Sequence, residues 1–323
     1  MKNFYIILGS LSSAVLVFIL ALTIYSHARH HRSLMAHLAE KYLKLTVKRY
    51  TDDEVREDIS NLPSRNDVKY KIPKIIRFSV PVTESEFGGM QVFKVGKEGG
   101  DKVILYLHGG GYVRQPRQHH WKFINKLAKR SGLRVIVPIY PKAPNHSYKD
   151  AYAILTDLYS EIVKSYKKIV VMGDSSGGGL VLGLCQSFGH GGLRQPDVLI
   201  LMSPWTDITL ANPLIPEYEK KDPMICASNE RIWGELWADG LPVDDYKVSP
   251  VNGDMTVLGK VELFAGTREM LYPDAVQLYE LMKKAKVDVK FTEGVGLNHV
   301  YQVFPIPEAR KTLKYICRVI ESA

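Results

Sequence analysis

A glycine-rich turn between two apolar runs constrains the fold of this chain more than any other segment. Residues 168–171 are Lys-Ile-Val-Val, residues 172–179 are Met-Gly-Asp-Ser-Ser-Gly-Gly-Gly, and a second apolar run follows. This order is typical of a strand, a tight turn and a helix, with Ser175 in a Gly-x-Ser-x-Gly pattern at the turn. Gly173 and Gly177 allow the strand and the helix to pass close together, because neither residue carries a Cβ. The turn therefore predicts a nucleophile elbow with an exposed serine oxygen.

Apolar runs of strand length and helix length alternate along most of the chain. We expect strands at residues 75–82, 90–95, 102–107, 133–140, 198–202, 261–265 and 287–292, and helices near 118–130, 148–165, 229–238, 273–285 and 307–320. Alternation of this kind needs crossover connections, which favour a mostly parallel sheet with helices packed on it. A chain of 323 residues is long enough to bury such a core. The predicted fold class is therefore α/β.

A serine hydroxyl is a poor nucleophile at neutral pH and needs a histidine base that a carboxylate orients. In a fold with a nucleophile elbow, the acid and then the histidine follow the serine along the chain. Of the two histidines downstream of Ser175, His190 follows so closely that little chain remains for an acid. His299 comes directly after the expected strand at 287–292. Because such sheets place reactive groups at the carboxyl ends of their strands, His299 is the predicted base.

Two acidic residues follow the expected strand at 261–265 and qualify as the partner of the histidine. Asp274 comes after Pro273 and belongs to the first turn of a helix, where the helix dipole favours a carboxylate without any catalytic role. Glu269 lies in the loop itself. We therefore expect Glu269 to be the acid, with Asp274 as the alternative.

The sequence also offers donors for an oxyanion. The segment 108–111 is His-Gly-Gly-Gly and follows the expected strand at 102–107. Backbone N–H groups of a glycine run can point at developing negative charge without interference from side chains. The N–H of Ser176, the residue after the nucleophile, adds a further donor. The glycine run predicts an oxyanion-stabilising loop.

These motifs together resemble the hormone-sensitive-lipase-like family of α/β-hydrolases. The matching segments are His-Gly-Gly-Gly-Tyr at 108–112, Tyr-Pro-Lys-Ala-Pro-Asn-His at 140–146, Gly-Asp-Ser-Ser-Gly-Gly at 173–178, Ser-Pro-Trp at 203–205, Gly-Thr-Arg-Glu at 266–269 and Asn-His-Val-Tyr at 298–301. The chain departs from the family at the acid, where the family usually has aspartate in place of Glu269. The family's second aspartate usually lies four residues after the acid, whereas Asp274 lies five residues after Glu269.

The resemblance implies an α/β-hydrolase fold, with a mostly parallel central sheet flanked by helices and a small helical cap. It implies a cap built from the amino-terminal helices and the segment after Trp205. It also implies that Gly110, Gly111 and Ser176 supply the oxyanion-hole N–H groups. The remaining motif residues that support the site are His108, Gly109, Gly173, Asp174 and Gly177.

The predicted function is that of a serine carboxylesterase that hydrolyses short-to-medium acyl esters through an acyl-enzyme. The substrate is expected to be a small-molecule or lipid ester, and no cofactor or metal is required. An amidase or deacetylase acting on aryl amides is an alternative, because the same catalytic triad serves both reactions. A ligand receptor on a hydrolase scaffold is another alternative, which the presence of all three triad residues disfavours.

The amino-terminal residues 4–25 contain no charged side chain and would form a helix about 33 Å long, enough to cross a bilayer. A cleavable signal peptide has a shorter apolar core of about 7–15 residues, so an uncleaved anchor is the preferred interpretation. Lys2 precedes this run, whereas Arg29 and Arg32 follow it. The positive-inside rule then predicts a single-pass membrane protein with a cytoplasmic catalytic domain. An anchor of this kind also resembles the arylacetamide deacetylases, which face the lumen.

The predicted domains are an anchor at 1–28, a basic amphipathic helix and connector at 29–71, and a catalytic domain at 72–323 with a cap insertion at about 205–245. The formal net charge is +9, but much of the excess lies just after the apolar run, where it suits anionic lipid headgroups. The chain contains no nucleic-acid-binding motif, so nucleic acid is not an expected partner. Its three cysteines lack metal-ligand spacing. The sequence leaves the oligomeric state open.

Overall fold

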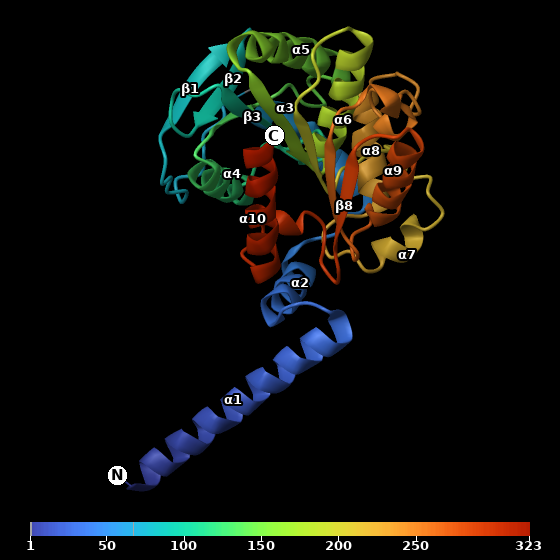
Figure 1. Ribbon diagram of the computed structural model, residues 1–323. Coiled ribbons are helices and arrows are strands. Elements are labelled where there is room, and N and C mark those ends of the chain that lie inside the picture. The colour runs from blue at the N-terminus through green and yellow to red at the C-terminus, as the bar shows by residue number, and fades with distance from the viewer. Residues whose placement is uncertain (1, 67) are drawn as a thin grey trace.

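A rounded α/β body and one long projecting helix make up the molecule (Figure 1). The computed structural model describes residues 2–66 and 68–323, with side chains from residue 15 onward. The projecting helix is α1 (Lys2–His30), and α2 (Leu34–Thr46) joins it to the body. Ser33 caps α2, because its side chain accepts the N–H of Ala36.

The body is built on a sheet of eight strands in the order β1-β2-β4-β3-β5-β6-β7-β8. The strands are β1 (Val82–Phe87), β2 (Met90–Val95), β3 (Lys102–Leu107), β4 (Arg134–Pro138), β5 (Lys168–Asp174), β6 (Val198–Met202), β7 (Val261–Gly266) and β8 (Val289–Gly294). The pairs from β4 to β8 are parallel, and β2 is antiparallel to both β1 and β4. The predicted α/β fold with a mostly parallel sheet is confirmed.

Helices cover both faces of the sheet, which explains the continuous apolar runs in its central strands. The helices after α2 are α3 (Asp52–Asn66), α4 (Gln118–Ser131), α5 (Tyr148–Ser165), α6 (Ser176–His190), α7 (Ile215–Glu219), α8 (Ala227–Ala238), α9 (Tyr272–Lys284) and α10 (Pro307–Ser322). Neighbouring residues on one strand enter opposite cores. Leu105 packs with α5, α6 and α9, whereas Ile104 packs with α4 and α10.

The predicted strand at 75–82 is wrong except for its last residue. Residues 75–81 form turns and coil, and β1 begins only at Val82. Pro73 and Pro81 lack the N–H that a strand would donate, which disfavours ladder pairing on both sides of the segment. Its apolar residues Ile76 and Phe78 nevertheless pack against the core as coil.

Helix α3 lies in the stretch predicted to be a polar connector. It begins with a capping box, in which Glu54 N donates to Thr51 Oγ1 and Thr51 N donates to Glu54 Oε2. The Thr-x-x-Glu spacing of 51–54 was the available sequence signal for this helix start, and the prediction of a connector overlooked it. Val55 and Leu62 supply its buried side.

The predicted membrane anchor is wrong. Among the described residues, no helix is long and apolar enough to cross a membrane. The predicted run at residues 4–25 falls on α1, and the side chains of its residues 4–14 lie outside the described part of the chain. Three further predictions depend on this anchor and are therefore corrected with it: the single-pass membrane location, the cytoplasmic orientation of the catalytic domain, and the membrane as partner of the basic flank. Arg32 of that flank is buried in an ion pair with Glu40 instead.

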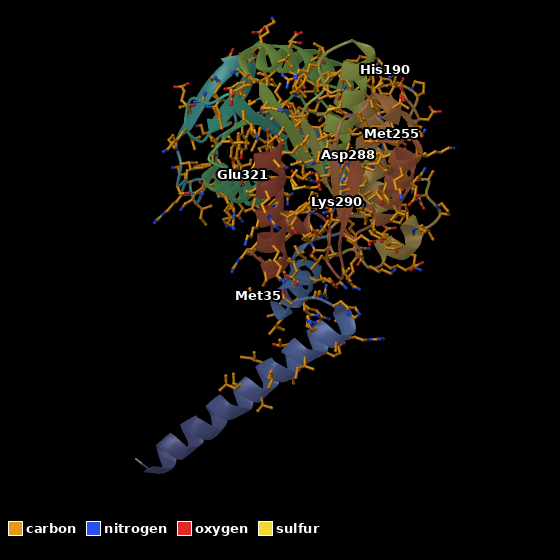
Figure 2. The ribbon with its side chains drawn as sticks, in the orientation of Figure 1. Met35, His190, Met255, Asp288, Lys290 and Glu321 are labelled. Atoms are coloured by element: carbon orange, nitrogen blue, oxygen red, sulfur yellow. The ribbon has the colours of Figure 1, made fainter. Side chains whose placement is uncertain are left out.

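The core and the exposed side of α2 offer a matched stability test. Leu155 on α5 is fully buried, whereas Leu45 on α2 is 87% exposed; Figure 2 labels Met35, an exposed residue at the other end of the same helix. We expect Leu155→Ala to lower the free energy of unfolding by about 2–5 kcal/mol, because it leaves a cavity. Leu45→Ala should change it by less than about 0.5 kcal/mol. Urea unfolding followed by circular dichroism measures both, and equal effects would contradict this assignment of the core.

Candidate active site

Ser175 occupies a strained turn between β5 and α6. Its backbone has φ 52° and ψ −126°, a conformation that non-glycine residues rarely adopt. A Cβ on Gly173 would lie 2.4 Å from the carbonyl oxygen of Gly177, and a Cβ on Gly177 would lie 2.2 Å from that of Leu107. Both positions therefore require glycine, and the turn has the geometry expected of a nucleophile elbow.

His299 lies beside the serine. It follows β8 in a loop, its side chain is 3% exposed, and its Nε2 is 3.0 Å from Ser175 Oγ. The other downstream histidine, His190, ends α6 at an exposed position of the body (Figure 2). The spacing of Ser175 and His299 permits direct proton transfer from the hydroxyl to the imidazole.

Glu269 is fully buried behind the imidazole. Its Oε2 lies 3.5 Å from His299 Nδ1, an ion-pair distance longer than a hydrogen bond. Burial alone would lower the pKa of His299, but the interaction with Glu269, together with the charges of Asp222 and Glu230, outweighs it and raises that pKa above its ordinary value. The carboxylate thus favours the imidazolium that forms when the histidine accepts a proton.

Ser203, at the end of β6, connects the acid to the histidine loop. Its hydroxyl donates to Glu269 Oε2 at 2.7 Å and accepts the N–H of Val300 at 3.1 Å. This hydroxyl fixes the orientation of the carboxylate relative to the residue that follows His299. Sequence reasoning did not assign it a role, although its place directly after a buried strand was the available signal.

Asp274, the alternative acid, lies in the first turn of α9 and is buried. No hydrogen bond or ion pair connects it to His299 in the described part of the chain. Burial, reinforced by the nearby Asp207, raises the pKa of Asp274 to about 7. Asp274 is thus partly neutral at pH 7, which weakens it as a partner for an imidazolium.

The glycine run after β3 passes between the elbow and α8. A Cβ on Gly109 would lie 2.6 Å from Asp174 Oδ2, and a Cβ on Gly111 would lie 2.5 Å from the Trp233 ring of α8. Ser176 is the first residue of α6, so its N–H has no acceptor within the helix. Its buried hydroxyl accepts the N–H of Tyr112 at 3.3 Å, so this side chain ties the glycine run to the elbow.

Asp174 anchors the elbow to two neighbouring elements. The N–H of Arg117 donates to His120 Nδ1, so the proton of this ring lies on Nε2, which donates to Asp174 Oδ2 at 3.1 Å. The Tyr106 hydroxyl donates to the other carboxylate oxygen. Burial raises the pKa of Asp174, but His120 and Tyr106 outweigh it and hold that pKa well below its usual range. His108 is buried nearby, stacked on Tyr140.

Ser175, His299 and the glycines at 109–111 line a pocket of about 180 Å³. Its wall includes Arg114, Met224, Ile225, Glu230 and Trp233. Burial raises the pKa of Glu230 to about 7. Sequence reasoning did not assign a role to Glu230 or Asp222, because neither belongs to a recognisable motif.

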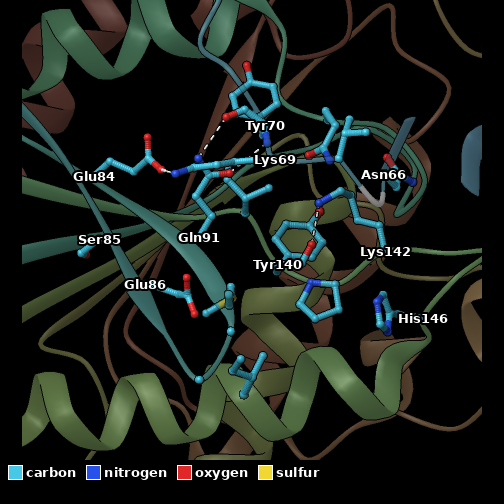
Figure 3. Close-up of a pocket in the computed structure, with 18 residues that line it drawn as sticks. Asn66, Lys69, Tyr70, Glu84, Ser85, Glu86, Gln91, Tyr140, Lys142 and His146 are labelled. Carbon is cyan, nitrogen blue, oxygen red and sulfur yellow. Dashed lines mark hydrogen bonds and ion pairs between the residues drawn. The ribbon is translucent and has the colours of Figure 1, made fainter. Parts of the chain in front are cut away.

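A larger cavity of about 870 Å³ lies between the β1–β2 hairpin and the segment that contains Tyr140 and Lys142 (Figure 3). Neither Ser175 nor His299 lines it. Cavity size alone therefore does not locate the catalytic groups in this molecule.

An α/β-hydrolase is defined by three features: a serine at the turn between a strand and a helix, a histidine after the last strand, and a carboxylate after the preceding strand. Residues 104–303, more than half of the chain, match the family model described as "alpha/beta hydrolase fold", and the chain belongs to this family. The predicted resemblance to the hormone-sensitive-lipase-like α/β-hydrolases is confirmed.

Several relatives and solved structures are similar to this chain. An esterase of Acinetobacter venetianus is 29% identical over 68% of this chain and 75% of its own length. An acetyl-hydrolase of Streptomyces hygroscopicus is 25% identical over 66% of this chain and 73% of its own length. A crystal structure of a Staphylococcus aureus protein proposed to be an esterase is 30% identical, covers 87% of this chain and 97% of that chain, and has a TM-score of 0.82.

The two candidate acids are separable by mutation. We expect Glu269→Ala to lower kcat by about 10⁴-fold, as the loss of the acid does in other triads. Asp274→Ala should change kcat by less than about tenfold, because this carboxyl has no contact with the histidine. Steady-state hydrolysis of p-nitrophenyl acetate measures both variants, and the reverse ranking would make Asp274 the acid.

Proposed function

We propose that this protein is a serine carboxylesterase with Ser175 as nucleophile, His299 as general base and Glu269 as the acid. The observation that carries the proposal is the 3.0 Å distance between Ser175 Oγ and His299 Nε2 at a strained elbow that faces a glycine run. Family membership and the esterases among the relatives support a hydrolase of carboxylic esters.

The proposed reaction begins when Ser175 Oγ attacks the ester carbonyl while His299 Nε2 accepts the hydroxyl proton. Glu269 stabilises the resulting imidazolium. The N–H groups of Gly110, Gly111 and Ser176 stabilise the oxyanion. His299 then gives its proton to the leaving alcohol, and an acyl-enzyme remains. Water, activated by the same histidine, releases the carboxylic acid and restores the serine.

The dimensions of the pocket favour small substrates. A volume of about 180 Å³ accommodates a short acyl group more readily than a long lipid chain. Trp233 lies against Gly111 and so limits the space beside the oxyanion donors. Esters with short acyl groups are therefore the proposed substrates, which agrees with the acetyl-hydrolase among the relatives.

Replacement of the nucleophile tests the proposal. Ser175→Ala should lower kcat on p-nitrophenyl acetate on the order of 10⁶-fold, because the acyl-enzyme can no longer form. Ser160→Ala, the same chemical change on the outer helix α5, is the control and should leave kcat unchanged. Equal rates in Ser175→Ala and the parent would contradict the mechanism. A parent that hydrolyses the matched p-nitroanilide faster than the ester would instead be an amidase, and one that binds both without turnover would be a receptor.

A further inference from the structure

The junction between α1 and α2 packs directly on the two loops that carry Glu269 and His299. The carbonyl oxygen of His30 lies so close to Gly296 that a Cβ there would be 2.0 Å from it. Arg32 donates to the carbonyl oxygen of Gly296 at 2.8 Å. These contacts join segments more than 260 residues apart in the chain, and Figure 1 shows α2 against the body near α10.

A buried carboxylate, Glu40 of α2, is the centre of this contact. It is 2% exposed and forms ion pairs with Arg32, with Lys44 at 2.9 Å and with Arg268. The Arg268 pair is bidentate, with Nε 2.9 Å from Oε2 and Nη2 3.1 Å from Oε1. Arg268 immediately precedes Glu269, so the carboxylate of α2 holds the residue next to the catalytic acid.

The carboxyl group of Glu40 is ionised near neutral pH. Burial would raise its pKa, but the hydrogen bonds from Arg268, Arg32 and Lys44 outweigh it and lower that pKa to about 2. His30 and His37 pack beside the cluster, and burial, reinforced by Arg32, lowers the pKa of both rings. Both rings are therefore neutral near pH 7, where the cluster holds one anion among three cations.

The cluster also holds the histidine loop, since Arg32 bonds both Glu40 and Gly296. The two loops bond each other as well, through Arg268 N and Leu297 O at 3.0 Å. Ser33 fixes the junction itself, because its N and Oγ donate to the carboxylate of Glu308 on α10 at 2.6 and 2.9 Å.

On the opposite side of the acid, Asp222 Oδ2 accepts the N–H of Met270 at 2.8 Å. Glu269 is thus held through both of its chain neighbours. An ion pair of 3.5 Å between Glu269 and His299 is sensitive to small displacements of either loop, because a catalytic constellation tolerates errors of only about 0.5 Å.

We propose that Glu40 is a positioning residue of the catalytic triad, which fixes the acid loop through Arg268 and the histidine loop through Arg32. The proposal rests on the proposed function. It makes the amino-terminal helix α2 part of the catalytic machinery, although no atom of Glu40 contacts the reacting groups.

The test is Glu40→Gln in the full-length protein, with p-nitrophenyl acetate as substrate. The variant keeps the size of the side chain but removes the charge, so Arg268 loses its ionic partner. We expect kcat to fall by about 10–100-fold, the range for a misplacement of about 1 Å, with KM within about twofold of the parent. Glu161→Gln, which removes an exposed carboxylate from α5, should behave as the parent.

The pH profile separates positioning from simple destabilisation. The groups that face His299 are Glu269 of the acid loop, Asp222 of the loop between α7 and α8, and Glu230 of α8. If Glu269 moves away, the imidazolium is less stabilised and the pKa of His299 falls. The acidic limb of the pH profile of kcat/KM then shifts to lower pH. A variant that is merely less folded loses activity at all pH values equally and keeps the parent's limb.

A second variant covers the case in which Glu40→Gln does not fold. Arg268→Met leaves Glu40 paired with Arg32 and Lys44, so the buried charge stays compensated, and kcat should fall in the same range. A folded Glu40→Gln or Arg268→Met variant with the parent's kcat and acid limb would overturn the inference. If the proposed function itself is wrong, the result is different: the parent and Ser175→Ala then hydrolyse the ester at equal rates.

Discussion

The close passage of β5, the Ser175 turn and α6 is the constraint on which the rest of the structure depends. The turn has room for no Cβ at Gly173 or Gly177, and the serine holds a backbone conformation that costs energy. That cost is tolerated because buried contacts surround the turn: Asp174 is bonded to α4 and β3, and Ser176 is bonded to the glycine run. The same contacts hold the glycine run, which carries the proposed oxyanion donors, beside the strained turn.

Three buried carboxyl groups surround His299, and their hydrogen-bond environments differ. Glu269 is nearest to the ring and receives a hydrogen bond from Ser203. Asp222 has its pKa raised to about 6 by burial, although three backbone N–H groups donate to it, and the pKa of Glu230 is raised to about 7. Glu230, at the pocket wall, has the pKa closest to 7 and therefore exchanges a proton near neutral pH.

Patterns that depend on local order were predictable from the sequence. The chain order of serine, acid and histidine selects Ser175 and His299, whose side chains lie 3.0 Å apart, and the alternation of apolar runs predicts the parallel sheet. Contacts between distant segments were not predictable. Glu40 and Arg268 are separated by more than 220 residues, and neither belongs to a motif that indicates their pairing. The apolar run at the amino terminus led to the wrong prediction of a membrane anchor. Its composition does not reveal that the adjoining junction between α1 and α2 packs on the loops that carry Glu269 and His299.

The central claim, that Ser175 is the activated nucleophile, is tested most directly by covalent labelling. A fluorophosphonate phosphonylates a serine only where a base and an oxyanion site activate it. Mass spectrometry of the proteolysed, labelled protein should find one adduct per chain, on the peptide that contains Ser175, and none after Glu269→Ala within the same reaction time. An unlabelled protein, or an adduct on a different residue, would contradict the account.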